Sequence, residues 1–151
     1  MAIGTDQETD PLVAFNFALE VQGVVTGYFT EVSGLGSETE VIDHLVMGAN
    51  NQQIVKKVPG RLKWENIVLK RGITDQMDIW TWRKSVVDGG VDSNRHDGSV
   101  VMYNQNGTEV ARWNFLKAWP AKVSGPQPKS DSNEIGIEEM TIVHEFIERV
   151  N

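Results

Sequence analysis

The sequence predicts a mainly β fold, a small β-barrel or two-sheet sandwich with one flanking α-helix and a long projecting hairpin or loop. Alternation of apolar and polar residues recurs along most of the chain, and this period of two is typical of strands with one buried face. A single segment has the three-to-four-residue spacing of an amphipathic helix. The length of 151 residues fits one domain spanning residues 1–151.

The clearest strand is the stretch "FNFALEVQ". Its apolar residues Phe15, Phe17, Leu19 and Val21 share one face. A second strand is expected at residues 24–32, directly after a glycine.

The next segment, about residues 38–70, reads as a long excursion whose middle leaves the body. Strand-like alternation covers residues 38–47, and "GANNQQ" is typical of a turn or tip. Extended structure resumes at "IVKKV", and Pro59-Gly60 predicts a turn or bulge before a strand at residues 61–70.

The helix is predicted at residues 75–87, capped by Thr74 or Asp75 and stopped by Gly89-Gly90. Trp80 and Trp82 lie about 200° apart around such a helix. We therefore expect either that one of the two indole rings has a partner outside the domain's own body, or that the helix is wedged between two surfaces.

The C-terminal third begins with a hairpin at residues 99–119, because Asn106-Gly107 readily adopts the positive φ angles of a tight turn. A Pro/Ser/Gly-rich loop follows at residues 120–133. Residues 134–150 are rich in β-branched side chains, which favours a last long strand over a helix.

Composition excludes several classes of function. The net charge of −7 disfavours a general nucleic-acid binder, and the absence of cysteine excludes disulfides, zinc–thiolate sites and thiol nucleophiles. The three histidines are far apart, and no serine stands in a G-x-S-x-G motif. We expect no enzyme activity, no cofactor and no metal site. No apolar run is long enough to span a membrane, so we expect no stable membrane association.

Some elements are apolar on both faces, which a small barrel with one wet face does not require. They are residues 67–69, the Trp80–Trp82 pair and residues 140–143. Such a pattern is typical of an obligate assembly, whose interfaces resemble a core cut in half. The alternative is that all of these side chains lie inside one domain.

The stretches "DPLVAFNFALEVQGVVTGYFTEVSGLGSETEV", "PGRLKWENIVLKRGITDQMDIWTW", "WNFLKAWPAKVSGP" and "EEMTIVHEFIER" together resemble the inner tube proteins of contractile-tailed phages and phage-tail-like contractile injection systems. These proteins are related to the type VI secretion tube protein. The resemblance covers the whole chain and implies hexameric rings that stack into a hollow tube. Contraction of a surrounding sheath would drive this tube through a target envelope.

The resemblance also implies partners and a location. The partners would be further copies of the chain, the sheath protein, baseplate, hub and spike proteins, a tape measure, and cargo in the lumen, either a protein effector or DNA. The protein would be assembled in the cytoplasm as part of a phage tail or of a tail-like particle, released or retained by the cell. The alternatives are a minor baseplate or tail-terminator component with the same barrel, or a carbohydrate-binding module that uses the five tryptophans.

By the same resemblance, two sets of residues become candidate sites. Contacts between subunits and between stacked rings are expected at Met47, Asn50, Asn51, Gln52, Arg61, Ile67, Leu69 and Trp82. The lumen is expected to be lined by polar strand faces carrying Asn16, Glu20, Gln22, Glu38 and Glu40.

Overall fold

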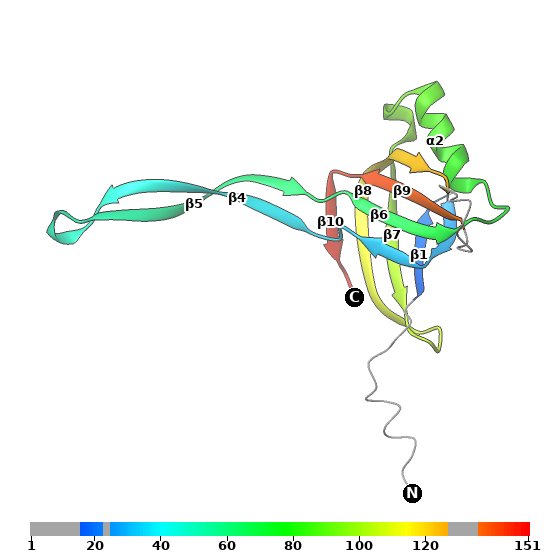
Figure 1. The fold of residues 1–151 in the computed structure, drawn as a ribbon, viewed down its shortest axis with the longest axis horizontal. Coiled ribbons are helices and arrows are strands. Elements are labelled where there is room, and N and C mark those ends of the chain that lie inside the picture. The colour runs from blue at the N-terminus through cyan, green and yellow to red at the C-terminus, as the bar shows by residue number, and fades with distance from the viewer. Residues whose placement is uncertain (1–15, 23–24, 127–135) are drawn as a thin grey trace, which may run out of the picture.

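A computed structural model describes residues 16–22, 25–126 and 136–151, which form ten strands and one α-helix (Figure 1). The strands are β1 (Asn16–Val21), β2 (Val25–Phe29), β3 (Glu31–Ser33), β4 (Ser37–Met47), β5 (Gln53–Trp64), β6 (Ile67–Gly72), β7 (His96–Tyr103), β8 (Glu109–Ser124), β9 (Ile137–Val143) and β10 (Phe146–Arg149). The helix is α2 (Asp78–Gly89), and short 3₁₀ turns occur at Ala49–Asn51 and Asp92–Asn94. The predicted fold class is confirmed. Within the described ranges, no helix is long and apolar enough to cross a bilayer.

The main sheet is antiparallel and follows the order β2-β1-β7-β8-β9-β6-β3, with β10 added alongside β8. Its hydrogen-bonded path does not close on itself. The two end strands, β2 and β3, are nevertheless consecutive in the chain and are joined at Thr30, whose N–H donates to Lys70 O at 2.9 Å. Strand β8 is long enough to pair with β7 along its first half and with β9 along its second. The sheet therefore curls around one core.

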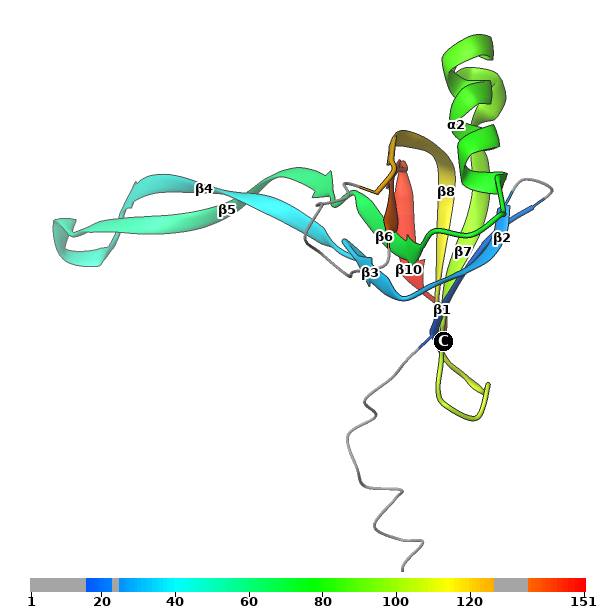
Figure 2. The ribbon, with the colours of Figure 1, turned by 45° about the vertical axis from the view of Figure 1, so that its right-hand side comes forward.

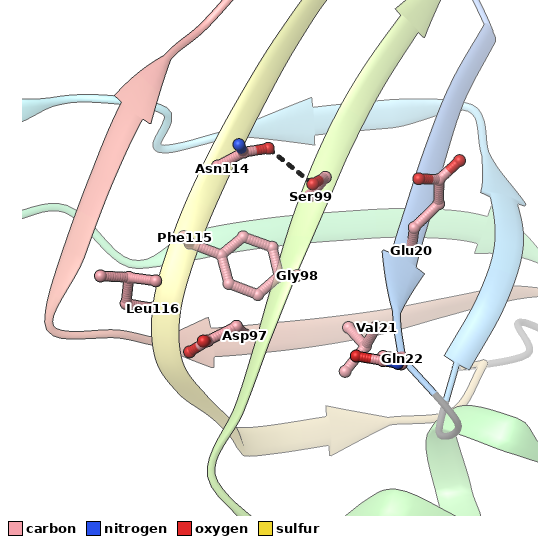
Figure 3. A pocket seen from close by; sticks show the side chains of 9 residues that line it. All are labelled: Glu20, Val21, Gln22, Asp97, Gly98, Ser99, Asn114, Phe115 and Leu116. Atoms are coloured by element: carbon pink, nitrogen blue, oxygen red, sulfur yellow. Dashed lines mark hydrogen bonds between the residues drawn. The ribbon is translucent and has the colours of Figure 1, made fainter.

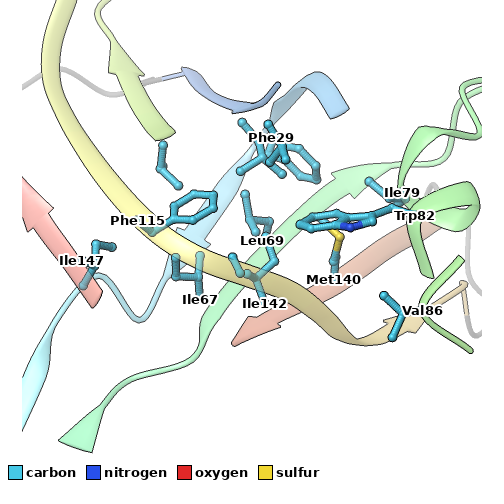
Figure 4. Packing of buried hydrophobic residues seen from close by; sticks show 14 residues of the cluster. Phe29, Ile67, Leu69, Ile79, Trp82, Val86, Phe115, Met140, Ile142 and Ile147 are labelled. Atoms are coloured by element: carbon cyan, nitrogen blue, oxygen red, sulfur yellow. The ribbon is translucent and has the colours of Figure 1, made fainter. Parts of the chain in front are cut away.

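The core lies between the curled sheet and α2 (Figure 4). Leu19, Leu69, Phe115 and Ile142 project into it from four different strands and have no exposed surface. The helix contributes Ile79, Trp82 and Val86, whose spacing of three and four residues places them on one helical face. Burial of these side chains is the main stabilising contribution that the fold makes from its own residues.

The long excursion is a two-stranded hairpin formed by β4 and β5, as predicted, but it is shorter than expected. Strand β5 continues through Pro59-Gly60, where the pairing with β4 is shifted by a bulge. The break comes later, at Glu65 and Asn66, because β5 pairs with β4 whereas β6 pairs with β3 and β9. At this break Gly34 has φ +82°, and a Cβ there would collide with the carbonyl oxygen of Asn66.

The helix begins three residues later than predicted, and the expected capping residues are wrong. Met77 occupies the N-cap position and provides no side-chain hydrogen bond. Thr74 Oγ1 instead accepts a hydrogen bond from Gln76 N in the preceding turn. The predicted stop is confirmed, because Gly90 follows the helix with φ +88°.

The hairpin around Asn106-Gly107 is confirmed as β7 and β8, although only Gly107 of this pair has a positive φ angle, at +78°. The last segment is extended, as predicted. It is interrupted at His144 and Glu145, where β9 ends and β10 begins. The loop expected from residue 120 is wrong in its first part, because β8 continues through Pro120 to Ser124. Residues 127–133 of that loop, residues 134–135 of the predicted last strand and Phe15 of the first strand lie outside the described residues.

Candidate assembly surfaces

The hairpin of β4 and β5, residues 37–64, projects away from the body, and we call it the arm (Figures 1 and 2). Its strands pair with each other and belong to a separate two-stranded sheet. Twelve extended residues in β5 correspond to roughly 40 Å, which is comparable to the diameter of a domain of this size. Isolated two-stranded hairpins are marginally stable in water, so an arm of this length needs a second surface beside it.

Both faces of the arm are apolar. Directly opposed residues of two antiparallel strands share a face, which places Val41, Leu45, Val55 and Met47 together on face A. These four side chains are 50–64% exposed. Face B carries Ile42, Val46, Ile54 and Val58, of which the two isoleucines are about half exposed. The arm therefore has no polar side that could face water at low cost.

The charges of the arm are arranged in exposed pairs. Lys57 Nζ donates to Asp43 Oδ1 at 2.6 Å on face A, and Lys63 Nζ lies 3.0 Å from Glu40 Oε1 nearer the body. Surface pairs of this kind contribute little to stability. Lys56, opposite His44 on face B, forms no ion pair within the described part of the chain.

The tip of the arm is a tight turn. Asn50 and Asn51 have φ angles of +64° and +59°, a left-handed conformation that asparagine tolerates better than most residues. Gly48 N donates to Gln52 O at 2.8 Å and closes the turn. The predicted contact residues Met47, Asn50, Asn51 and Gln52 are all exposed here, and Arg61 is exposed nearer the body.

Three of the residues predicted to contact another subunit are wrong. Ile67 and Leu69 have no exposed surface, and Trp82 is 1% exposed, because all three lie in the chain's own core. The Trp82 indole N–H also donates to Asn94 O at 3.2 Å. Side chains buried this completely have no surface left for a second copy.

Of the two alternatives for Trp80 and Trp82, the partner outside the body is wrong, and a helix that is covered on both sides is observed. Trp80 Nε1 donates to Glu138 Oε1 at 2.8 Å, and its ring packs against the core. Glu138 is buried on β9, where its other oxygen accepts a hydrogen bond from Arg71 Nε at 3.1 Å. Sequence spacing places the two rings on different sides of α2, but the sheet curls far enough to cover both.

Arg71 is the centre of this buried network. In addition to Glu138, its Nη2 donates to Asp78 Oδ1 at 2.9 Å, at the start of α2. Burial lowers the pKa of Arg71, but the hydrogen bonds with Asp78 and Glu138 outweigh it and raise the pKa above its ordinary value. The guanidinium is therefore charged and ties the helix to β6 and β9.

A polar row crosses the outer face of the main sheet. Cross-strand pairing aligns Glu20 of β1 with Ser99 of β7, Asn114 of β8 and Glu148 of β10. Ser99 Oγ donates to Asn114 Oδ1 at 2.7 Å, and Arg112 Nη1 donates to Glu20 Oε2 at 3.2 Å. We call this surface, carried by β1, β7, β8 and β10, the polar sheet face.

A shallow hollow of about 630 Å³ opens beside the polar row (Figure 3). Phe115 packs over Gly98 there, where a Cβ would lie only 2.7 Å from the ring and 2.5 Å from Glu20 O. The hollow is open and has no enclosed end, which suits contact with a large surface better than capture of a small molecule.

The residues expected to line a lumen are divided between two surfaces. Asn16 and Glu20 lie on the polar sheet face, and Gln22 follows the end of the same strand. Glu38 and Glu40 lie on the arm, where Glu40 pairs with Lys63. Sequence reasoning missed Arg112 and Asn114, although their alternation with Trp113 and Phe115 in the predicted hairpin was a usable signal.

The tryptophans do not form a platform for sugars. All five are buried or half-buried within the chain. Trp64, for example, packs edge-on against Phe146 with ring centroids 5.4 Å apart, and it also contacts His144, whose Nε2 lies 3.0 Å from Glu65 O. These contacts instead fix the base of the arm to the turn between β9 and β10.

Comparisons with known proteins agree with this geometry. The family model for the T4-like virus tail tube protein gp19 matches residues 13–148. No curated protein sequence matches the chain. Among solved structures, a chain of the PVC sheath–tube complex of an extracellular contractile injection system superposes with a TM-score of 0.74 at 22% identity, covering 99% of this chain and 98% of that one.

Two further structures share the fold. The tube-terminating cap of the anti-feeding prophage gives a TM-score of 0.71 at 24% identity, with 99% of both chains covered. Hcp1 from Flavobacterium johnsoniae gives 0.54 at 16% identity, covering 89% of this chain and 94% of that one.

Proposed function

Since the chain belongs to the T4-like virus tail tube protein gp19 family, we propose that it is the subunit of the inner tube of a contractile injection apparatus. Six copies form a ring, and rings stack into a hollow tube. The work of such a subunit is mechanical, because the tube must stay rigid while a contracting sheath drives it through a target envelope.

The observation that carries this proposal is the arm. It exposes apolar side chains on both faces and projects away from the body of its own chain. Exposed apolar surface of this extent is typical of an interaction site. A projecting element that inserts into a neighbour gives a heterologous contact, and such contacts generate closed rings or open filaments. The exposed tip, with Met47, Asn50, Asn51 and Gln52, supplies a contact between stacked rings in this arrangement.

The polar sheet face lines the lumen in this proposal. It presents Glu20, Glu109 and Glu148 with one arginine, Arg112, among them. A lining that is polar and net acidic lets acidic cargo or DNA slide past without adhering, since like charges repel. We assign the lumen to this face, with Asn16 and Glu20, in preference to Glu38 and Glu40 on the arm.

The partners follow from the same assignment. Structurally similar chains occur in a sheath–tube complex, in a tube-terminating cap and in a baseplate, which supports a sheath, a terminator and a baseplate as neighbours of the tube. The further partners in this proposal are hub and spike proteins, a tape measure, and a protein or DNA cargo in the lumen. The assembled particle is a phage tail or a tail-like injection particle, built in the cytoplasm.

A terminator or baseplate component with the same fold is the second candidate, because the cap structure covers the chain as fully as the tube complex does. The two candidates differ in polymerisation. A tube subunit adds ring upon ring, whereas a terminator stops after one or two.

Negative-stain electron microscopy of the purified full-length protein tests the proposal. We expect six-membered rings that stack into tubes as the protein concentration rises. Isolated rings that never stack would favour the terminator. A protein that stays monomeric at high concentration, with no rings at all, would overturn both candidates.

A further inference from the structure

We propose that His144 is a pH-sensitive contact that fixes the direction of the arm relative to the body at neutral pH and releases the base of the arm in mild acid. The inference concerns one copy of the chain, so it does not depend on the proposed function. It adds a way in which the arm can change its direction while the core stays folded.

The direction of the arm is not fixed by the main sheet. Strands β4 and β5 pair with each other in a separate two-stranded sheet. Two short connections join them to the body: residues 34–36 lead from β3 into β4, and residues 65–66 lead from β5 into β6. Glu65 N donates to Gly36 O at 3.1 Å, which ties the two connections to each other. The direction of the arm therefore depends on contacts that the body makes with these connections.

His144 supplies such a contact. It lies in the turn between β9 and β10, and its Nε2 is 3.0 Å from Glu65 O. A carbonyl oxygen can only accept, so Nε2 is the nitrogen that carries the proton in the neutral ring. The ring also lies against Trp64, the last residue of β5, with ring centroids 6.0 Å apart. One imidazole thus contacts both the end of the arm and the connection that follows it.

The site suits the neutral imidazole better than the charged one. The Nδ1 atom of His144 is buried and forms no hydrogen bond within the described residues. A proton there would place a charged N–H at a sheltered position, and a charge without a partner is costly to bury. Burial accordingly lowers the pKa of His144, and it outweighs the backbone groups of Glu65 and Phe146, which favour the charged ring. In acid the ring is therefore more stable in water, and its departure breaks the contacts with Glu65 and Trp64.

The direction of the pH dependence follows from this difference. The released ring has the ordinary histidine pKa of about 6.5, whereas the bound ring takes up a proton less readily. The contact is therefore complete above this pH and weakens as the pH falls below it.

The charged groups of the body beside His144 do not offset this preference. Glu145, the next residue along the chain, accepts a hydrogen bond from Arg95 Nη1 at 2.9 Å and lies 3.8 Å from Lys117 Nζ. A carboxylate held by two cations has little attraction left for an imidazolium ring.

On the side of the arm, no acidic group is paired with His144 in the part of the chain that the structure describes. The Glu65 carboxylate lies over Gly36, where an added Cβ would be 3.2 Å from Oε2. Lys63, near the end of β5, lies 3.0 Å from Glu40 Oε1, so that these two charges neutralise each other.

Distances between two spin labels test the proposal, because the natural chain contains no cysteine that would take up a label. The variant Gln52→Cys/Asp88→Cys carries one nitroxide label at the tip of the arm and one on α2, both at exposed positions. The variant Gln105→Cys/Asp88→Cys carries both labels on the body and serves as the control. Pulsed electron paramagnetic resonance on dilute, unassembled full-length protein then gives the distribution of each distance at pH 7.5 and at pH 5.5.

We expect the tip-to-helix distribution to be at least twice as wide at pH 5.5 as at pH 7.5, and the body distribution to be unchanged. His144→Gln in the same labelled chain should abolish this response to pH, because glutamine does not titrate in this range. The matched variant His96→Gln should retain the response. His96 is also half-buried beside a tryptophan, with its ring centroid 6.1 Å from that of Trp82, but it lies away from the arm.

Equal widths at the two pH values in the labelled chain with His144 intact would overturn the inference. A response that persists in His144→Gln would do the same. A response of equal size in the body pair would also contradict it, because it would indicate loss of the core rather than release of the arm. These readouts concern one copy, so they leave the proposed function untouched, and a failure to form rings or tubes would leave this inference intact.

Discussion

The body and the arm of this protein use the same kinds of side chain in opposite ways. In the body, Leu19, Leu69, Phe115 and Ile142 are buried completely, and the ion pairs of Arg71 are enclosed with them. In the arm, large aliphatic residues remain half exposed or more, and both ion pairs lie in water. The difference indicates that one chain encodes a self-sufficient core and a separate surface that is complete only beside another copy.

The largest effect is expected where the body's buried charge network is broken. Arg71→Ala leaves Glu138 and Asp78 without their cationic partner, and breaking a buried pair costs about 3–5 kcal/mol. Urea unfolding of the unassembled protein measures this loss. The matched arm variant, Lys57→Ala, removes an equally short but exposed ion pair and should cost less than about 1 kcal/mol. Equal losses in the two variants would contradict the contrast between body and arm.

The second comparison concerns apolar residues. Leu69→Ala creates a cavity in the core and should destabilise the isolated chain by about 2–5 kcal/mol. Leu45→Ala, on face A of the arm, should change the same measurement by less than about 0.5 kcal/mol but weaken assembly, as followed by sedimentation. A Leu45 variant with unfolding as impaired as that of Leu69→Ala would show that the arm is stabilised within one copy.

The smallest expected effect lies at the junction of the two regions. Burial lowers the pKa of His144 below its ordinary value, so the unfolded chain binds the proton more readily than the folded one. Stability is therefore full above the ordinary histidine pKa of about 6.5 and falls as the pH drops below it.

The variant His144→Gln removes this titration and should flatten the difference in urea midpoint between pH 7.5 and pH 5.5. The comparison with the unmodified chain subtracts the titration of all other groups. An unchanged pH dependence in the variant would exclude His144 as its source.

Much of the fold could be predicted because its strands alternate cleanly. The first strand, the β7–β8 hairpin with its Asn-Gly turn, the Gly90 stop and the projecting arm are all legible in local patterns. The positions at which strands break could not be predicted from local patterns, because they depend on which strands pair with each other. The local sequence "WENI", residues 64–67, contains no turn signal. It therefore does not predict that the chain stops pairing with β4 here and begins to pair with β3 and β9.

The assembly surface was harder to predict for a related reason. Apolar residues on both sides of a strand indicate two contacts, but they do not reveal whether the second contact lies within the chain or outside it. For Leu69 and Trp82, the curled sheet and α2 of the same chain provide the second contact. Leu45 and Ile54 on the arm remain 64% and 49% exposed, so their second contact is not made within the chain.

The continuity of the arm with β6 has a mechanical consequence. A pull on the arm is passed along β5 into β6, whose six residues are hydrogen-bonded in register to β9. Force applied along a strand loads such bonds in shear, so they share the strain and must fail together rather than one after another. A neighbour bound to the arm would thus load the sheet in shear, the direction in which its hydrogen bonds resist force together. This resistance suits a subunit of a tube that is driven forward by a contracting sheath.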